Sequence, residues 1–199
     1  MKNRNVATAI FISCLFLMPQ SPALADAKTD GDRGIEAFRQ GNLIESMQLL
    51  ERSAKGGYAP AQVTLAYILD YSERDKEAFD WYQQAADSNN PAGMFGLGGM
   101  YAKGEGVGRD PVKAGQLTRR AAEMAHLPAM RAYAYALENG ALGFVRDDAA
   151  AVEWFRKAAD AGDQVSMRRL KDAYSQGQLG LPVDPAQASA WEQKIKPNN

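Results

Sequence analysis

Bulky residues recur at nearly equal intervals along most of this chain, and this spacing constrains the fold more than any other feature. The intervals are 32, 36, 37 and 37 residues, and they separate Leu49, Trp81, Leu117, Trp154 and Trp191. A pair of small residues follows each of the first four, as Ala85-Ala86 follows Trp81. Self-similarity at a period of this size is the sequence signature of a repeat architecture.

A second set of apolar residues repeats in the same frame. Its members are Leu65, Leu97, Tyr133 and Leu170, followed four residues later by Leu69, Tyr101, Leu137 and Tyr174. A separation of four keeps both sets on one face of a helix. Met94, Met130 and Met167 recur beside them, and we interpret these methionines and the three tryptophans as a core stripe. No strand pattern is present, so each repeat predicts two antiparallel helices.

Glycine opens and aspartate closes the segments that join the two helices of the later units. These segments are 104–110, 140–147 and 177–184. Glycine takes the left-handed conformation that commonly ends a helix, and aspartate is a preferred N-cap because its carboxylate accepts orphan backbone N–H groups. In the second unit a short link over residues 70–75 replaces this loop.

One helix pair cannot bury its apolar faces alone, whereas stacked pairs can. We therefore predict an all-α fold, an α-solenoid of about four and a half helix pairs over residues 34–195. The expected units are about 34–58, 59–90, 91–126, 127–163 and 164–195, with only a short first helix over 34–40. A short polar segment, 26–33, precedes the array, and a polar tail, 196–199, follows it.

The best-formed units resemble the Sel1-like repeat, a relative of the tetratricopeptide repeat. The resemblance rests on the segments 97–101, 104–107 and 154–162, together with Asp110 and Lys113-Ala114. It covers roughly residues 34–195 and implies a non-catalytic protein-binding scaffold. Such a scaffold holds a protein or peptide partner in the concave groove lined by the first helix of each pair.

In arrays of this geometry, positions two residues before and after the leucine column face the groove. The predicted partner-binding residues are Val63, Tyr67, Phe95, Arg131, Tyr135, Arg168 and Asp172, with Gly99 at the same register. Aromatic residues and arginines commonly anchor interfaces. We expect Arg131 and Tyr135 to be the main contacts, although inter-repeat packing is the alternative interpretation of the whole set.

The first 25 residues differ from the rest of the chain. Lys2 and Arg4 precede an apolar stretch over 6–18, which is shorter than the roughly 20 residues that span a bilayer. Ala23-Leu24-Ala25 follows, the small-x-small pattern of a signal-peptidase site. We expect cleavage after Ala25, a periplasmic or secreted mature chain, and no transmembrane segment in it. The alternative is a lipoprotein acylated at Cys14.

Charge and composition exclude several functions. The net charge of −1 supplies no bulk positive field for nucleic acid. His126 is the only histidine and Cys14 the only cysteine, so a zinc site would depend on carboxylates. We expect no enzyme activity, no cofactor and no metal.

Two alternatives stay open. A hydrolase acting on cell-wall or polysaccharide material would need two facing carboxylates, and candidates occur over 73–77 and at Asp147-Asp148. The chain also ends its last unit on Trp191 without an obvious cap, so we consider self-association through the C-terminal unit.

Overall fold

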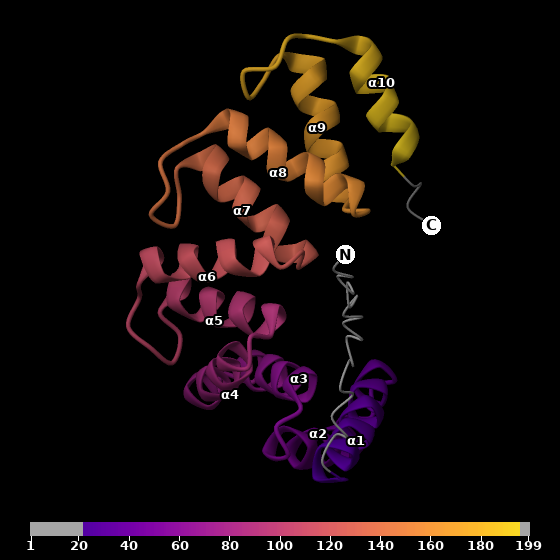
Figure 1. Ribbon diagram of the computed structural model, residues 1–199, viewed down its shortest axis with the longest axis vertical. Coiled ribbons are helices and arrows are strands. Elements are labelled where there is room, and N and C mark those ends of the chain that lie inside the picture. Colours follow the sequence, from indigo (N-terminus) through magenta and orange to yellow (C-terminus); the bar gives the residue numbers. More distant parts are fainter. Residues whose placement is uncertain (1–21, 196–199) are drawn as a thin grey trace, which may run out of the picture.

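The computed structural model describes residues 22–195, and within that range the chain forms ten helices and no strand. Figure 1 shows the helices stacked along an arc from α1 to α10. The helices are α1 (Pro22–Arg39), α2 (Leu43–Lys55), α3 (Ala59–Tyr71), α4 (Asp75–Asp87), α5 (Pro91–Lys103), α6 (Pro111–Glu123), α7 (Leu127–Asn139), α8 (Asp148–Asp160), α9 (Gln164–Gln176) and α10 (Pro185–Lys194). The all-α solenoid is confirmed, with five pairs in place of about four and a half.

The loops within the later pairs have the predicted chemistry. Gly104, Gly140 and Gly177 follow the ends of α5, α7 and α9 in the left-handed conformation, with φ of 86°, 62° and 67°. The Asp110 side chain accepts a hydrogen bond from the backbone N–H of Lys113 at the start of α6, 2.9 Å away. Asp147 and Asp184 cap α8 and α10 in the same way.

The first helix is longer than the sequence predicted. The expectation was a helix over 34–40 after a polar segment, but α1 runs from Pro22 to Arg39 and includes 26–33. Small residues on one side of α1 let it lie close to α2. Ser53 Oγ donates a hydrogen bond to the carbonyl of Ala27, 2.6 Å away, and Ser46 Oγ donates to that of Gly34, 2.9 Å away. These buried bonds fix α1 as the first helix of a complete pair.

Buried apolar residues form two clusters along the array. The larger runs from Leu50 to Met130 with Ala158, and the smaller runs from Ala134 to Trp191. The predicted methionine stripe is confirmed, because Met94, Met130 and Met167 are all buried. The tryptophan stripe is partly wrong.

Trp81 and Trp154 are only partly buried, and the next residue in each helix, Tyr82 or Phe155, is the buried one. One residue along a helix turns the side chain by roughly 100°, which moves it from the core to the edge.

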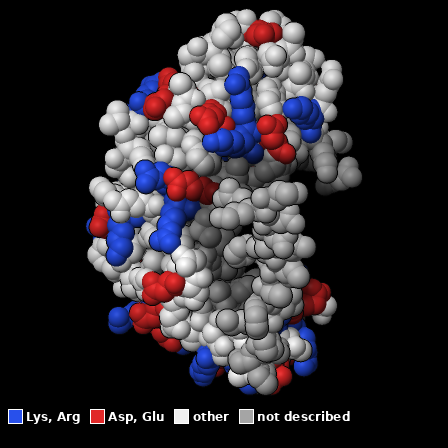
Figure 2. Space-filling model, in the orientation of Figure 1, with Lys and Arg blue, Asp and Glu red and all other residues white. Residues whose placement is uncertain are grey.

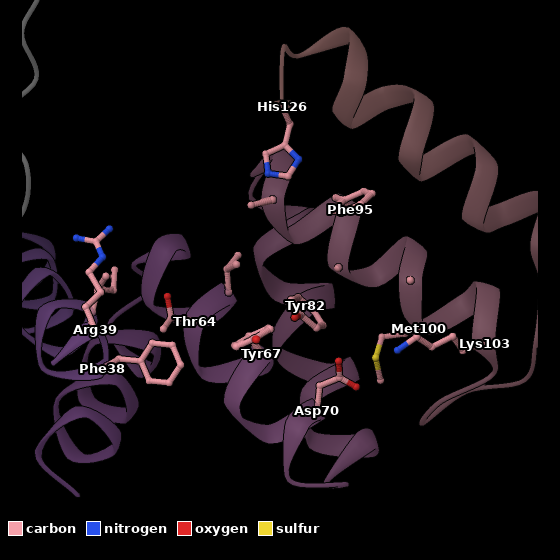
Figure 3. A pocket seen from close by; sticks show the side chains of 15 residues that line it. Phe38, Arg39, Thr64, Tyr67, Asp70, Tyr82, Phe95, Met100, Lys103 and His126 are labelled. Atoms are coloured by element: carbon pink, nitrogen blue, oxygen red, sulfur yellow. The ribbon is translucent and has the colours of Figure 1, made fainter. Parts of the chain in front are cut away.

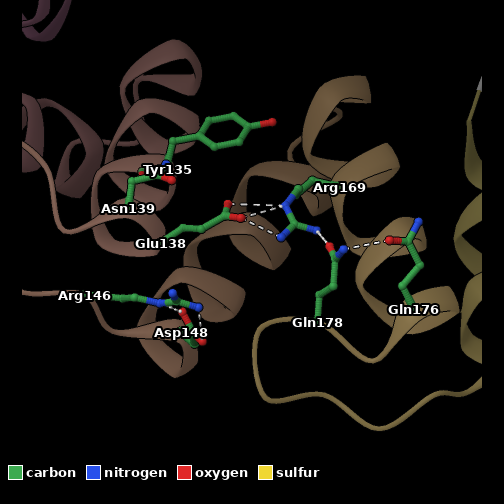
Figure 4. Close-up of polar contacts among 8 residues, drawn as sticks. All are labelled: Tyr135, Glu138, Asn139, Arg146, Asp148, Arg169, Gln176 and Gln178. Carbon is green, nitrogen blue, oxygen red and sulfur yellow. Dashed lines mark hydrogen bonds and ion pairs between the residues drawn. The ribbon is translucent and has the colours of Figure 1, made fainter.

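Polar pairs also join neighbouring repeats. Arg169 on α9 contacts Glu138 on α7 through Nε and Nη2, at 3.1 and 2.5 Å from Oε1, and its Nη1 donates to Gln178 (Figure 4). Both charged side chains are mostly buried, so removing one would leave the other poorly compensated. The pair fixes the spacing between α7 and α9.

Candidate functional site

The first helices of the first three pairs enclose a hollow of about 540 Å³. Most of its lining comes from α1, α3 and α5, with Tyr82 from α4 and His126 from the turn before α7 (Figure 3). We call this space the aromatic hollow because Phe38, Tyr67, Tyr82 and Phe95 line it. Such a concave, mostly apolar space with a few polar groups is typical of a binding site.

Ring contacts hold the walls of the aromatic hollow in place. The rings of Phe38 on α1 and Tyr67 on α3 meet edge to face, with centroids 6.1 Å apart. The ring of Phe95 lies 5.4 Å from the imidazole of His126. Tyr67 is nevertheless 52% exposed, and Tyr71, one turn further along α3, is 85% exposed. The hollow therefore offers accessible aromatic surface on a rigid frame.

A second hollow of about 410 Å³ continues the first. It lies mainly on α7, with Arg131, Tyr135 and Asn139 in its lining, and it shares Phe95 with the aromatic hollow. We call the two adjoining hollows together the groove, which lies along the first helices of the first four pairs.

Five of the seven predicted partner-binding residues lie in this groove. Val63 and Tyr67 line the aromatic hollow, Arg131 and Tyr135 line the second hollow, and Phe95 lines both. Gly99 also faces the aromatic hollow. The other two, Arg168 and Asp172 on α9, line neither hollow.

Two of these residues also have structural roles that the sequence did not reveal. Arg131 Nη1 donates to Asp163 Oδ1 at 2.6 Å, and Asp163 in turn caps α9 by accepting from Ser166 N at 2.9 Å. The Tyr135 ring packs edge to face on the ring of Phe155, with centroids 4.9 Å apart. Changes at Arg131 or Tyr135 therefore affect the fold as well as the groove.

Sequence reasoning missed the place of His126 in the groove. Its side chain is half-buried, and its Nδ1 is buried without a hydrogen-bond partner among the described residues. Burial lowers the pKa of this imidazole below its ordinary value. A histidine directly before the Leu127-Pro128 helix start was the only available signal.

We expect acid to destabilise the fold through His126. The unfolded chain binds a proton near pH 6.5, whereas the folded imidazole resists protonation, so stability is present above about pH 6.5 and falls as the pH drops below it. Proton NMR should give a midpoint below 6.5 for the folded imidazole. His126→Phe should show a smaller loss of unfolding free energy between pH 7.5 and 5.5 than the unaltered chain; an equal loss would contradict this origin.

Three of the five carboxylates considered for a hydrolase have local structural contacts. Glu77 pairs with Arg74 through two hydrogen bonds of 2.8 and 2.7 Å, and Asp148 pairs in the same way with Arg146 (Figure 4). Asp147 caps α8. Within residues 22–195, no three histidine, cysteine, aspartate or glutamate residues gather as a metal site would require.

The C-terminal unit does not present the apolar end that motivated self-association. Trp191 is only 8% exposed and packs in the smaller cluster, with Lys194 Nζ 4.1 Å from its ring centroid. The exposed positions of α10 carry small or polar residues, including Gln187, Ser189 and Gln193.

Charges on the described surface are mixed. Figure 2 shows acidic and basic side chains interleaved over the face in view, without one large patch of either sign. Among the helices of residues 22–195, none is long and apolar enough to cross a lipid bilayer.

The fold and groove define a helix-pair repeat protein of the solenoid class, and comparison with known proteins identifies the repeat. The Sel1 repeat model matches residues 23–58, 59–90, 91–126, 127–163 and 166–194. The chain belongs to the Sel1 repeat family. Sel1 repeat proteins are typically non-catalytic scaffolds for protein–protein interaction.

Two solved structures share this fold. A Sel1 repeat protein from Oxalobacter formigenes is 25% identical, with a TM-score of 0.79 over 86% of this chain and 71% of that one. The protective antigen c5321 of uropathogenic Escherichia coli is 32% identical, with a TM-score of 0.73 over 85% of this chain and 38% of that one.

A curated plant protein is also similar. The ERAD-associated E3 ubiquitin-protein ligase component HRD3A from Arabidopsis thaliana is 30% identical over 123 residues, which are 53% of this chain. The match spans only 18% of the length of that protein.

Proposed function

We propose that this protein is an exported, non-catalytic scaffold of the bacterial envelope that holds a partner polypeptide in its groove. The groove, made of the aromatic hollow and the second hollow on either side of their shared residue Phe95, carries this proposal. Its walls combine accessible aromatic rings with few charges. Such surfaces bury a large area on binding, while few side-chain rotamers lose their freedom. The Sel1 repeat relatives from two bacteria support a bacterial source.

The sequence features of residues 1–25 support export, and most of these residues lie outside the described part of the chain, as does Cys14. A cut after Ala25 would remove four residues of α1, Pro22 to Ala25. The contact between Ala27 and Ser53 would survive. The proposed mature chain therefore keeps the hydrogen bonds that join α1 to α2. Localisation is tested by fractionating cells that express the full chain and measuring the mature N-terminus.

We expect Gly99→Gln to block partner binding while stabilising the fold. A Cβ at Gly99 would meet no atom within 4 Å, so the side chain would extend into the aromatic hollow. Replacing a glycine inside a helix also stabilises it by about 0.5–1 kcal/mol. Affinity capture from solubilised envelope should recover a specific partner with the unaltered chain and lose it with Gly99→Gln. Chemical denaturation should nevertheless give a higher unfolding free energy for Gly99→Gln than for the unaltered chain.

Gly108→Gln is the matched control. Gly108 is exposed in a loop and lines neither hollow, and a Cβ at this position would likewise meet no atom within 4 Å. The variant should retain the partner. If Gly99→Gln kept the captured partner at full yield, the groove would not be the binding surface. No specific observation favours the hydrolase, and three of its five candidate carboxylates, Glu77, Asp147 and Asp148, have structural contacts of their own.

A further inference from the structure

Within residues 22–195, Asp70 is the charged residue in the lining of the aromatic hollow that forms no ion pair. The other charged side chains there have partners, since Arg39 pairs with Glu36 at 3.6 Å and Lys103 with Glu105 at 2.9 Å. Among residues 22–195, the Asp70 carboxylate has neither a hydrogen bond nor an ion pair. Burial raises its pKa, and the nearby carboxylates of Glu105 and Asp75 oppose the effect of Lys103. Among the described residues, this end of the hollow thus has one cation, Lys103, near the three carboxylates of Asp70, Asp75 and Glu105.

The position of Asp70 in its helix is also unfavourable. Asp70 lies in the last turn of α3, which ends at Tyr71. Backbone carbonyls give the C-terminal end of a helix a partial negative charge, so a carboxylate there is destabilising. A residue that breaks a local rule without a compensating contact is expected at a functional site. The folded chain alone gives Asp70 no such contact.

Aromatic and thioether groups surround this carboxylate. Figure 3 shows Asp70 at the same end of the hollow as Tyr67, Tyr82 and Met100, with Lys103 beside Met100. The faces of tyrosine rings attract ammonium and guanidinium groups, and a desolvated site strengthens that attraction. The methylene stem of a lysine or arginine would pack on the same apolar surface. The hollow therefore offers one surface to the stem and a carboxylate to the charged head.

We propose that the aromatic hollow takes a lysine or arginine side chain of an extended partner polypeptide, with its cationic head beside Asp70. This inference rests on the proposed function and adds the chemistry of the partner. A polypeptide fits the site because the second hollow adjoins the aromatic hollow at Phe95 and offers a surface to the residues flanking the basic side chain. The exposed ring of Tyr67 in the lining suits an apolar neighbour of that residue.

Three blocked peptides test the charge preference. They have the sequence acetyl-Ala-Phe-X-Phe-Ala-amide, where X is lysine, norleucine or glutamate. Each is titrated into the isotope-labelled protein, purified after expression of the full chain, and the amide resonances of Tyr67, Gly99 and Met100 are followed by NMR. We expect the lysine peptide to bind about tenfold more tightly than the norleucine peptide, because a charge-assisted hydrogen bond is worth roughly that factor. The glutamate peptide should be weakest.

Two matched variants assign the preference to one carboxylate. Asp70→Asn should reduce the lysine-to-norleucine ratio to about one, since the amide keeps the shape and removes the charge. It should also unfold at the same or a higher temperature, because it relieves the unfavourable charge at the end of α3. Asp80→Asn removes the same charge from an exposed position of α4 outside the hollow and should keep the tenfold ratio.

Equal affinities for lysine and norleucine peptides, or a tenfold ratio retained by Asp70→Asn, would overturn the inference. So would the absence of shifts at the lining amides with all three peptides at millimolar concentration. These failures are separate from failure of the scaffold function. That function stands if Gly99→Gln loses the captured envelope partner, and it fails if Gly99→Gln retains it, whatever the peptides show.

Discussion

Replacing Phe155 with alanine should lower the unfolding free energy by about 3–5 kcal/mol, the range for truncating a buried phenylalanine. The Phe155 side chain is fully buried, and it supports the Tyr135 ring from beneath, 4.9 Å away between centroids. The substitution would leave a cavity between α7 and α8, directly under the second hollow. Urea denaturation followed by circular dichroism measures the loss.

Trp154→Ala is the informative comparison for Phe155→Ala. Trp154 is larger but only partly buried, with its ring against Tyr133, 5.2 Å away, and Lys157 over its face. Trp154→Ala should lower the unfolding free energy by about 1–2 kcal/mol, in the ordinary range for single substitutions. If Trp154→Ala destabilised the chain more than Phe155→Ala, the assignment of the core face of α8 would be wrong.

Arg131→Met should be the second most damaging change. It removes the ion pair of Asp163, whose side chain is only 6% exposed, and leaves a buried charge beside the start of α9. Removing one partner of a buried pair costs about 3–5 kcal/mol. The lower end applies here because the Arg131 side chain is 34% exposed. The measurement is again the unfolding free energy by urea denaturation.

Arg119→Met provides the control for Arg131→Met. Arg119 also pairs with a carboxylate, Glu123 at 3.4 Å, but both side chains are more than half exposed. Exposed pairs on one helix contribute about 0.3–0.5 kcal/mol, so this variant should remain close to the unaltered chain. Equal effects of the two methionine substitutions would show that Asp163 does not depend on Arg131. Partner loss in an Arg131 variant should therefore be interpreted only beside its stability.

Local rules explain why most of the architecture could be predicted from the sequence. The glycine and aspartate of each loop act on the nearest turn of backbone, so Gly104 and Asp110 reveal a helix end and a helix start without reference to the rest of the chain. The period of the bulky residues then predicts that successive helix pairs stack on one another. The first helix escaped prediction because its packing side is made of Ala27, Gly31 and Gly34. These small residues suit close approach but resemble a flexible segment in sequence.

The groove could be predicted in part for the same reason. Helical register, taken with the geometry of such arrays, predicted a groove side that includes Val63, Tyr67 and Phe95, and all three line the aromatic hollow. Register does not reveal which polar side chains meet across repeats. Arg131 and Asp163 are 32 residues apart, and nothing in the sequence pairs them. The sequence placed Asp70 in a polar link, whereas the structure places it in the last turn of α3, in the wall of the aromatic hollow.

The contacts between helices are almost entirely those between neighbours in the chain, together with α1 on α3 and α3 on α5. No described helix near one end of the array has substantial contacts with the other end. A tandem duplication of one unit would therefore insert a complete helix pair between compatible surfaces and lengthen the groove by one section of wall. In this architecture, the length of the groove can therefore change by whole repeats, through duplications within the gene, without redesign of the existing walls.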